Sequence, residues 1–199
     1  MRLQNYINES NTDDLNKLIP VLKKECKPYL KECKKYDDFL YRSSKKDYDI
    51  RKLKPRVDRK PRDTPLPLHN YMDSIFKKKF GWNARSESIF ATSDYMFIEE
   101  YQGNPYIFFP IGNFKFLWHP EISDIFIIFR DHDIIDGNDK LIGDVSDHED
   151  TIKEFINGYK SDNLFSAMKS GNEIMIKCKE YYMVRSVYFN QLKEGLLYD

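Results

Sequence analysis

The chain has 199 residues, and 32 basic residues (Lys and Arg) balance 32 acidic ones (Asp and Glu), so its overall charge is not that of a general polyanion binder. Three Cys without a CxxC pair argue against a disulfide framework, and the absence of an apolar signal region or membrane-length apolar run predicts a cytoplasmic protein with no membrane segment. Its 41% hydrophobic content suffices for a core, and 14 Phe with 14 Tyr favour strands and stacking surfaces.

Charge is distributed unevenly along the chain. Residues 41–62 hold ten Lys or Arg against three Asp, whereas residues 131–150 hold eight acidic residues and one Lys. The basic segment is suited to a polyanion or is a disordered insertion, and the acidic one is best read as a solvated surface loop.

Hydrophobic periodicity, caps and turn residues predict an α+β protein in which a helical segment precedes a strand-rich body. In chain order, the predicted elements are a kinked helix or two helices at 12–36 with Pro20 inside, a strand at 38–44, a Lys-, Arg- and Pro-rich loop at 45–67, a helix at 68–80 closed by Gly81, a strand at 87–92, a helix at 94–101, strands at 106–111, 114–118 and 122–129, helices at 148–159 and 163–169, and strands at 173–178 and 181–184. Gly112-Asn113 predicts a hairpin between the strands at 106–111 and 114–118, and the last two strands are also expected to form a hairpin.

Three short motifs carry the chemical signal. The first is Phe39-Leu40-Tyr41-Arg42-Ser43-Ser44, in which a planar cationic side chain ends an apolar strand. The second is Ala91-Thr92-Ser93, where two adjacent hydroxyls follow a strand. The third is Glu173-Ile174-Met175-Ile176, where a carboxylate opens an alternating strand. Taken singly, each has an ordinary structural explanation, such as a surface arginine, a helix N-cap or a solvated glutamate.

Together these motifs resemble the ADP-ribosyltransferase fold of the arginine–serine–glutamate type. The order and spacing of the three match, and Tyr181-Tyr182-Met183-Val184 supplies the second strand that follows the glutamate. The resemblance covers roughly residues 38–185. It therefore predicts a split β-sheet core in an ADP-ribosyltransferase-like catalytic domain at residues 38–199, with an N-terminal helical segment at residues 1–37.

The resemblance implies roles for particular residues. Glu173 would be the catalytic carboxylate that holds the ribose and stabilises its developing positive charge, and Arg42 would hold the phosphates or the ribose of NAD. The other residues expected to contact NAD, or to hold in place the strand that forms the wall of its site, are Thr92, Ser93, Phe97, Tyr101 and Arg62. Arg59, Asp63 and Arg85 are weaker candidates, for which a solvated position is at least as good an explanation.

The sequence departs from the family pattern at two positions. Ala91 replaces the first serine of the hydroxyl triplet, so part of that role is lost or passes to Ser93 or Ser88. Gly171 stands two residues before Glu173, where family members that modify protein arginine usually carry Glu and several others carry Gln. The identity of the acceptor is therefore left open.

The resemblance implies an NAD-dependent mono-ADP-ribosyltransferase with a macromolecular acceptor, either a nucleic-acid base or a protein side chain. It would act as a toxin, a phage-defence effector or a phage-encoded modifier, and an antitoxin or inhibitor would be a further partner. Two alternatives remain: a non-enzymatic module that binds single-stranded nucleic acid, and an NAD glycohydrolase. The four His are scattered, and Asp131 to Gly137 misses the calcium-loop spacing, so we expect no metal.

Overall fold

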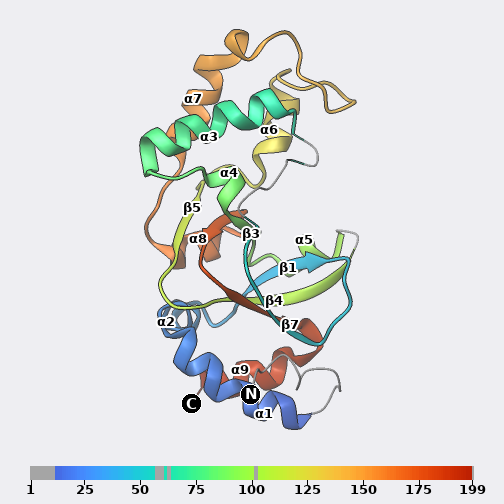
Figure 1. Ribbon diagram of the computed structural model, residues 1–199, viewed down its shortest axis with the longest axis vertical. Coiled ribbons are helices and arrows are strands. Elements are labelled where there is room, and N and C mark those ends of the chain that lie inside the picture. Colours follow the sequence, from blue (N-terminus) through green and yellow to red (C-terminus); the bar gives the residue numbers. More distant parts are fainter. Residues whose placement is uncertain (1–11, 57–60, 62–63, 101–102, 199) are drawn as a thin grey trace.

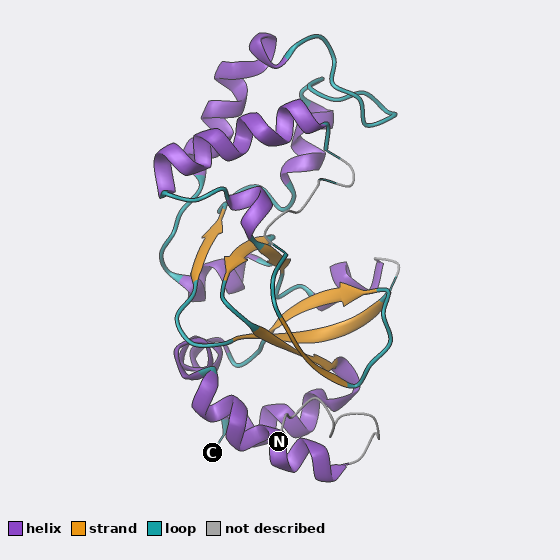
Figure 2. Ribbon diagram, viewed as in Figure 1, coloured by secondary structure: helices purple, strands orange, loops and turns teal. Residues whose placement is uncertain are grey.

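The computed structural model describes residues 12–56, 61, 64–100 and 103–198, and it has a mixed α+β architecture (Figures 1 and 2). Its α-helices are α1 (Thr12–Glu25), α2 (Lys27–Tyr36), α3 (Leu66–Phe80), α4 (Ala84–Glu87), α5 (Tyr95–Glu100), α6 (Ile125–Asp131), α7 (Glu149–Gly158), α8 (Leu164–Ser170) and α9 (Phe189–Leu197). Its strands are β1 (Leu40–Ser44), β2 (Ile50–Leu53), β3 (Ile89–Ala91), β4 (Asn104–Pro110), β5 (Lys115–Trp118), β6 (Ile174–Lys177) and β7 (Tyr181–Arg185). Short 3₁₀ turns precede α7 and α9.

The strands form two antiparallel sheets. One has four strands in the order β1-β4-β7-β2, and the other has three in the order β3-β6-β5. An isolated bridge between Tyr41 and Thr92 links the edge strand β1 to the end of β3, with N–O distances of 2.6 and 3.1 Å. The predicted α+β class is therefore confirmed, with the strands divided between two sheets.

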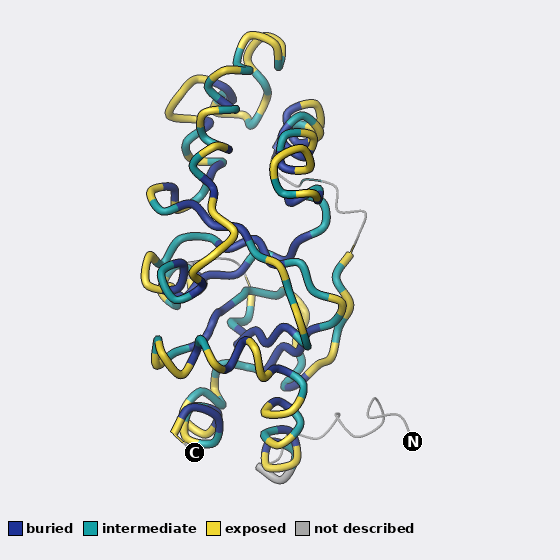
Figure 3. Tube along the Cα trace, turned by 90° about the vertical axis from the view of Figure 1, so that its left-hand side faces the viewer, coloured by how far each residue is buried: buried dark blue, intermediate teal, exposed yellow. Residues whose placement is uncertain are grey.

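The three-stranded sheet is buried on both faces. Ile174 and Ile176 pack in a core with the four-stranded sheet, α1, α2 and α9, whereas Met175 between them packs in a second core with α3, α6 and α7. Successive strand residues point to opposite faces, so a strand between two cores needs an unbroken apolar run, as Ile-Met-Ile provides. Figure 3 shows the buried residues gathered along the strands and the inner sides of the helices.

Helices α1 and α2 pack on the four-stranded sheet together with α9 (Figure 1). The helix break predicted near Pro20 lies instead at Cys26, and Pro20 is inside α1. Pro28 lies in the first turn of α2, where backbone N–H groups have no partner within the helix. Proline, which lacks this N–H, therefore loses no hydrogen bond there and favours a helix start. The domain boundary after residue 37 stays a prediction, and residues 1–11 lie outside the described part of the chain.

Both predicted hairpins are wrong. β4 and β5 lie in different sheets, because the Ile111 and Gly112 amides after β4 donate to the carbonyls of Glu180 and Glu25, at 3.0 and 2.7 Å, rather than closing a tight turn. β6 and β7 are likewise in different sheets. The two crossing segments, 111–114 and 178–180, thus run from one sheet to the other and are hydrogen-bonded together.

The strand predicted at 122–129 is also wrong, because residues 125–131 form α6. The Asp124 side chain accepts a hydrogen bond from the Phe126 amide at 2.8 Å and caps this helix. Ile125 and Phe129, four residues apart, form its buried side. The loop predicted at 45–67 contains the short strand β2, which pairs with β7. In the described part of the chain, no helix combines the length and apolar character needed to cross a bilayer.

Candidate active site

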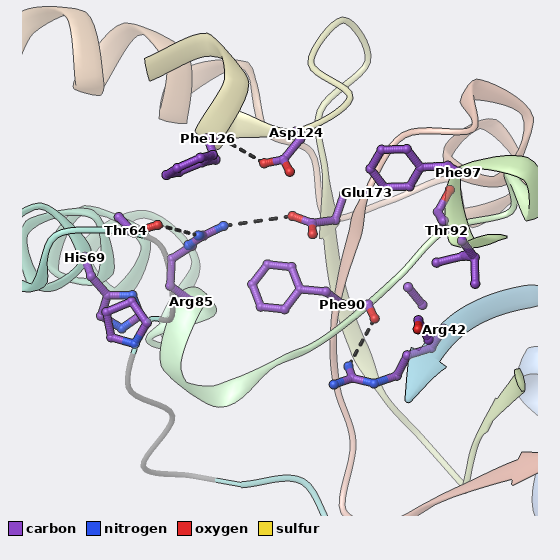
Figure 4. A pocket seen from close by; sticks show the side chains of 14 residues that line it. Arg42, Thr64, His69, Arg85, Phe90, Thr92, Phe97, Asp124, Phe126 and Glu173 are labelled. Carbon is purple, nitrogen blue, oxygen red and sulfur yellow. Dashed lines mark hydrogen bonds and ion pairs between the residues drawn. The ribbon is translucent and has the colours of Figure 1, made fainter. Parts of the chain in front are cut away.

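A pocket of about 440 Å³ lies where the two sheets meet, within the size range of small-molecule sites (Figure 4). Strands β1 and β3, helices α3, α4, α5 and α6, the residue before β6 and the chain leading into α3 all contribute to its wall. Its lining residues include Arg42, Thr64, His69, Arg85, Phe90, Thr92, Phe97, Asp124, Phe126 and Glu173.

Arg42 reaches the pocket from the middle of β1, where it pairs in register with Tyr106. Its Nη1 donates to the carbonyl oxygen of Phe90 at 3.1 Å, which fixes the guanidinium against β3. Burial lowers the pKa of Arg42, but an arginine pKa begins so high that the side chain stays charged. The Arg42 guanidinium has five N–H donors, and the bond to Phe90 uses one of them. The group therefore retains most of its capacity to bind an anion.

Glu173 lies immediately before β6. Its amide donates to the carbonyl of Ser123 at 3.0 Å, and its carboxylate lies 3.9 Å from Nη1 of Arg85. The Glu173 side chain is 23% exposed, so it is reachable from the pocket. An ion pair at that distance is loose, because a charge-assisted hydrogen bond would bring the atoms about 1 Å closer.

Thr92 and Ser93 hold the segment that leads to Glu173. The Thr92 hydroxyl donates to the carbonyl of Gly171 at 2.5 Å and accepts from the amide of Asp94 at 3.0 Å. The Ser93 hydroxyl donates to the carbonyl of Met168. Thr92 lines the pocket, whereas Ser93 is buried and is not among its lining residues. Both hydroxyls therefore act on the position of Glu173, and direct contact of Ser93 with NAD stays a prediction.

Of the aromatic candidates, Phe97 lines the pocket from α5. Tyr101 and Arg62 lie outside the described residues, as do Arg59 and Asp63. The structure thus brings Arg42, Thr92, Phe97 and Glu173 together from three segments of the chain.

Arg85, one of the weaker candidates in the sequence, is a second arginine in the pocket. Its guanidinium lies 5.0 Å from the centre of the Phe90 ring and donates to the Thr64 hydroxyl at 3.3 Å. Its backbone amide donates to Asp73 at 2.7 Å. The Nε atom is buried without a hydrogen-bond partner among the described residues. Arg85 is thus a cation held in place on the pocket wall.

Asp73 organises the wall that carries Arg85. Its carboxylate also accepts from the amide and the hydroxyl of Ser86, and the Ser86 hydroxyl lies 2.9 Å from Nε2 of the pocket residue His69. This network fixes the start of α4 against α3, because buried polar groups keep the geometry that satisfies them.

Asp124 and Phe126 also line the pocket, although they belong to none of the three sequence motifs. Asp124 is half-buried and combines its capping role with a place on the pocket wall. Ser123-Asp124 before an apolar run is typical of a helix start. This signal was missed because residues 122–129 were predicted to form a strand.

Among the described residues, no group of three His, Cys, Asp or Glu is placed to hold a metal ion. Comparison of the chain with protein-family models, with curated proteins and with solved structures returned no match.

Proposed function

We propose that this chain is an NAD-dependent mono-ADP-ribosyltransferase that transfers ADP-ribose to a macromolecule and releases nicotinamide. One observation carries the proposal: Arg42, Thr92 and Glu173, 131 residues apart at the extremes, meet at one pocket of ligand size. The resemblance identified in the sequence assigns these three residues a common site, and their convergence supports that assignment.

The two arginines suit the diphosphate of NAD. Two phosphate groups carry two negative charges, and the Arg42 and Arg85 guanidiniums carry two positive ones. Guanidinium groups bind phosphate oxygens through paired N–H donors. The aromatic rings of Phe90 and Phe97 offer apolar surface to the flat nicotinamide and adenine groups.

Glu173 suits the bond-breaking step. When the bond between ribose and nicotinamide breaks, its electron pair leaves with nicotinamide as a neutral molecule, and the ribose becomes oxocarbenium-like, as in glycoside hydrolysis. A carboxylate held against that centre stabilises the positive charge as it develops. Thr92 and Ser93, by fixing the segment 168–171, keep the carboxylate in place without reorganisation during the reaction.

A macromolecular acceptor forms part of the proposal because basic side chains follow β1 closely. Lys45, Lys46 and Arg51 are exposed and begin one residue beyond the strand that carries Arg42. We further propose that the protein acts in the cytoplasm as a toxin, a defence effector or a phage-encoded modifier, with an antitoxin or inhibitor as a partner.

The test uses the full chain with NAD⁺ labelled in its ADP-ribose part, first alone and then with cell lysate. We expect nicotinamide release, and transfer of label to material of high molecular weight in the lysate. Sensitivity of that label to nuclease or protease identifies the acceptor class. Nicotinamide release that yields only free ADP-ribose in both conditions would assign the chain as a glycohydrolase, and no release at all would refute NAD cleavage.

A further inference from the structure

A second carboxylate, Asp124, lies beside the proposed catalytic one. The amide of Glu173 donates to the carbonyl of Ser123 at 3.0 Å, which ties the segment before β6 to the residue preceding Asp124. Both carboxylates line the same pocket (Figure 4). The helix cap uses Oδ1 of Asp124, and a carboxylate has a second oxygen that can accept hydrogen bonds or a proton.

An aromatic ring and a cation adjoin Asp124. The Phe126 ring lies on the same side of the pocket as Asp124 in Figure 4, and the guanidinium of Arg130 lies 4.8 Å from the ring centre. The Arg130 side chain is 47% exposed and pairs with Asp139. Within two turns of α6 the protein therefore presents a carboxylate, a flat apolar surface and a positive charge near solvent.

This combination matches a nucleotide. Enzymes that modify a base hold it by stacking on aromatic or apolar side chains and by hydrogen bonds to its polar edge. An aspartate accepts from an exocyclic amino group, as in the contact with cytosine N4, and arginine binds the adjoining phosphate.

We propose that the acceptor is a nucleobase bearing an exocyclic amino group, that it stacks on Phe126, and that Asp124 is the base that accepts its proton. This inference rests on the ADP-ribosyl transfer proposed above. The amino nitrogen forms a bond to the ribose carbon as the bond to nicotinamide breaks, and the electron pair leaves with neutral nicotinamide. The proton lost from the amino nitrogen passes to the Asp124 carboxylate and from there to water.

The test offers the full chain labelled NAD⁺ with single-stranded oligonucleotides of one base each. Adenine, cytosine and guanine carry an exocyclic amino group and thymine does not, so oligo(dT) is the matched control. We expect at least one amino-bearing oligonucleotide to be labelled roughly tenfold or more above oligo(dT). Equal labelling of oligo(dT) would overturn the inference.

The matched variants are Asp124→Asn and Asp150→Asn. Asparagine still caps a helix but takes no proton, and Asp150 is an exposed residue of α7. We expect Asp124→Asn to lower the ratio of labelled oligonucleotide to free ADP-ribose about 100-fold, and Asp150→Asn to leave it as in the wild type. An unchanged ratio in Asp124→Asn overturns the role of Asp124.

The same experiment separates this inference from the proposed function. Nicotinamide release with label on protein, or on no oligonucleotide, overturns the base acceptor and leaves NAD cleavage standing. Absence of nicotinamide release refutes both.

Discussion

The hydroxyl of Thr92 donates a hydrogen bond of 2.5 Å to the carbonyl oxygen of Gly171, although the two residues lie 79 positions apart in the chain. Thr92 also forms the backbone bridge to Tyr41, one residue before Arg42. A single threonine therefore fixes the segment that carries the candidate carboxylate relative to the strand that carries the candidate arginine.

Replacing Thr92 by Val removes the hydroxyl and keeps the shape. We expect a loss of about 1–2 kcal/mol in the free energy of unfolding, because a buried carbonyl and the Asp94 amide each lose a partner. We also expect slower nicotinamide release, since Glu173 is less firmly held. Urea unfolding and a nicotinamide assay measure the two effects. Thr92→Ser retains the hydroxyl and serves as the control; if Val behaves like Ser in both assays, Thr92 has no positioning role.

Replacing Glu173 by Gln removes the charge and nearly preserves the volume. We expect nicotinamide release to fall roughly 10²–10³-fold, because a neutral amide stabilises a developing cation poorly. Affinity for NAD⁺, measured by calorimetry, should change little. Glu154→Gln, an exposed residue of α7, is the matched control and should retain full activity. Wild-type turnover in Glu173→Gln would remove this residue from the mechanism.

Replacing Arg42 by Ala should weaken NAD⁺ binding. Hydrogen bonds to charged groups contribute about 1.5–3 kcal/mol, so we expect the Kd to rise roughly 10- to 100-fold. Arg51→Ala is the control, because Arg51 is exposed on β2 and is not among the residues that line the pocket. Equal affinity in the Arg42→Ala variant and the wild type would show that the guanidinium does not contact the dinucleotide.

Stability should fall between neutral and mildly acidic pH because of His119. Burial lowers the pKa of this side chain, and its Nδ1 accepts from the amides of Glu121 and Ile122 at 3.1 and 3.0 Å, which requires the neutral ring. Below the unfolded pKa, about 6.5, the unfolded chain binds the proton more readily than the folded one. The free energy of unfolding therefore decreases as pH falls from about 6.5 towards the lower folded pKa.

Urea unfolding at pH 7.5 and pH 5.5 tests this prediction. His119→Asn should lose much of the difference between the two pH values, whereas the exposed His132→Asn should retain it. A wild-type protein with equal stability at both pH values would contradict the assignment.

Local signals in the sequence predicted several elements well. The helix at 68–80 and its closing Gly81 correspond to α3, which spans Leu66–Phe80 and has Gly81 in the left-handed conformation at its C-terminus. The strand predicted at 38–44 and the apolar run after Glu173 also correspond to β1 and β6. These elements are defined by periodicity and caps within a few residues, which a single sequence contains.

The errors arose where two local signals conflict or where distant residues decide the structure. Ile125 to Phe129 is rich in β-branched and aromatic residues, which favours a strand, but the Asp124 cap and burial of Ile125 and Phe129 give a helix. At residues 112–113, where a hairpin turn was predicted, the amide of Gly112 donates instead to the carbonyl of Glu25, about 90 residues earlier. Asp124 was missed because the segment that follows it was taken for a strand. Arg85 was only a weaker candidate, because it is the fold that brings it to within 3.9 Å of Glu173.

The division of the strands between two sheets has a mechanical consequence. Arg42 belongs to one sheet, while Glu173 and Thr92 belong to the margin of the other, and the joint consists of the Tyr41–Thr92 bridge and the bonded crossings at 111–114 and 178–180. The distance between the proposed anion-binding arginine and the proposed catalytic carboxylate therefore depends on how the two sheets are connected. If the proposed function holds, substitutions in this connection should change the activity even though they lie outside the pocket.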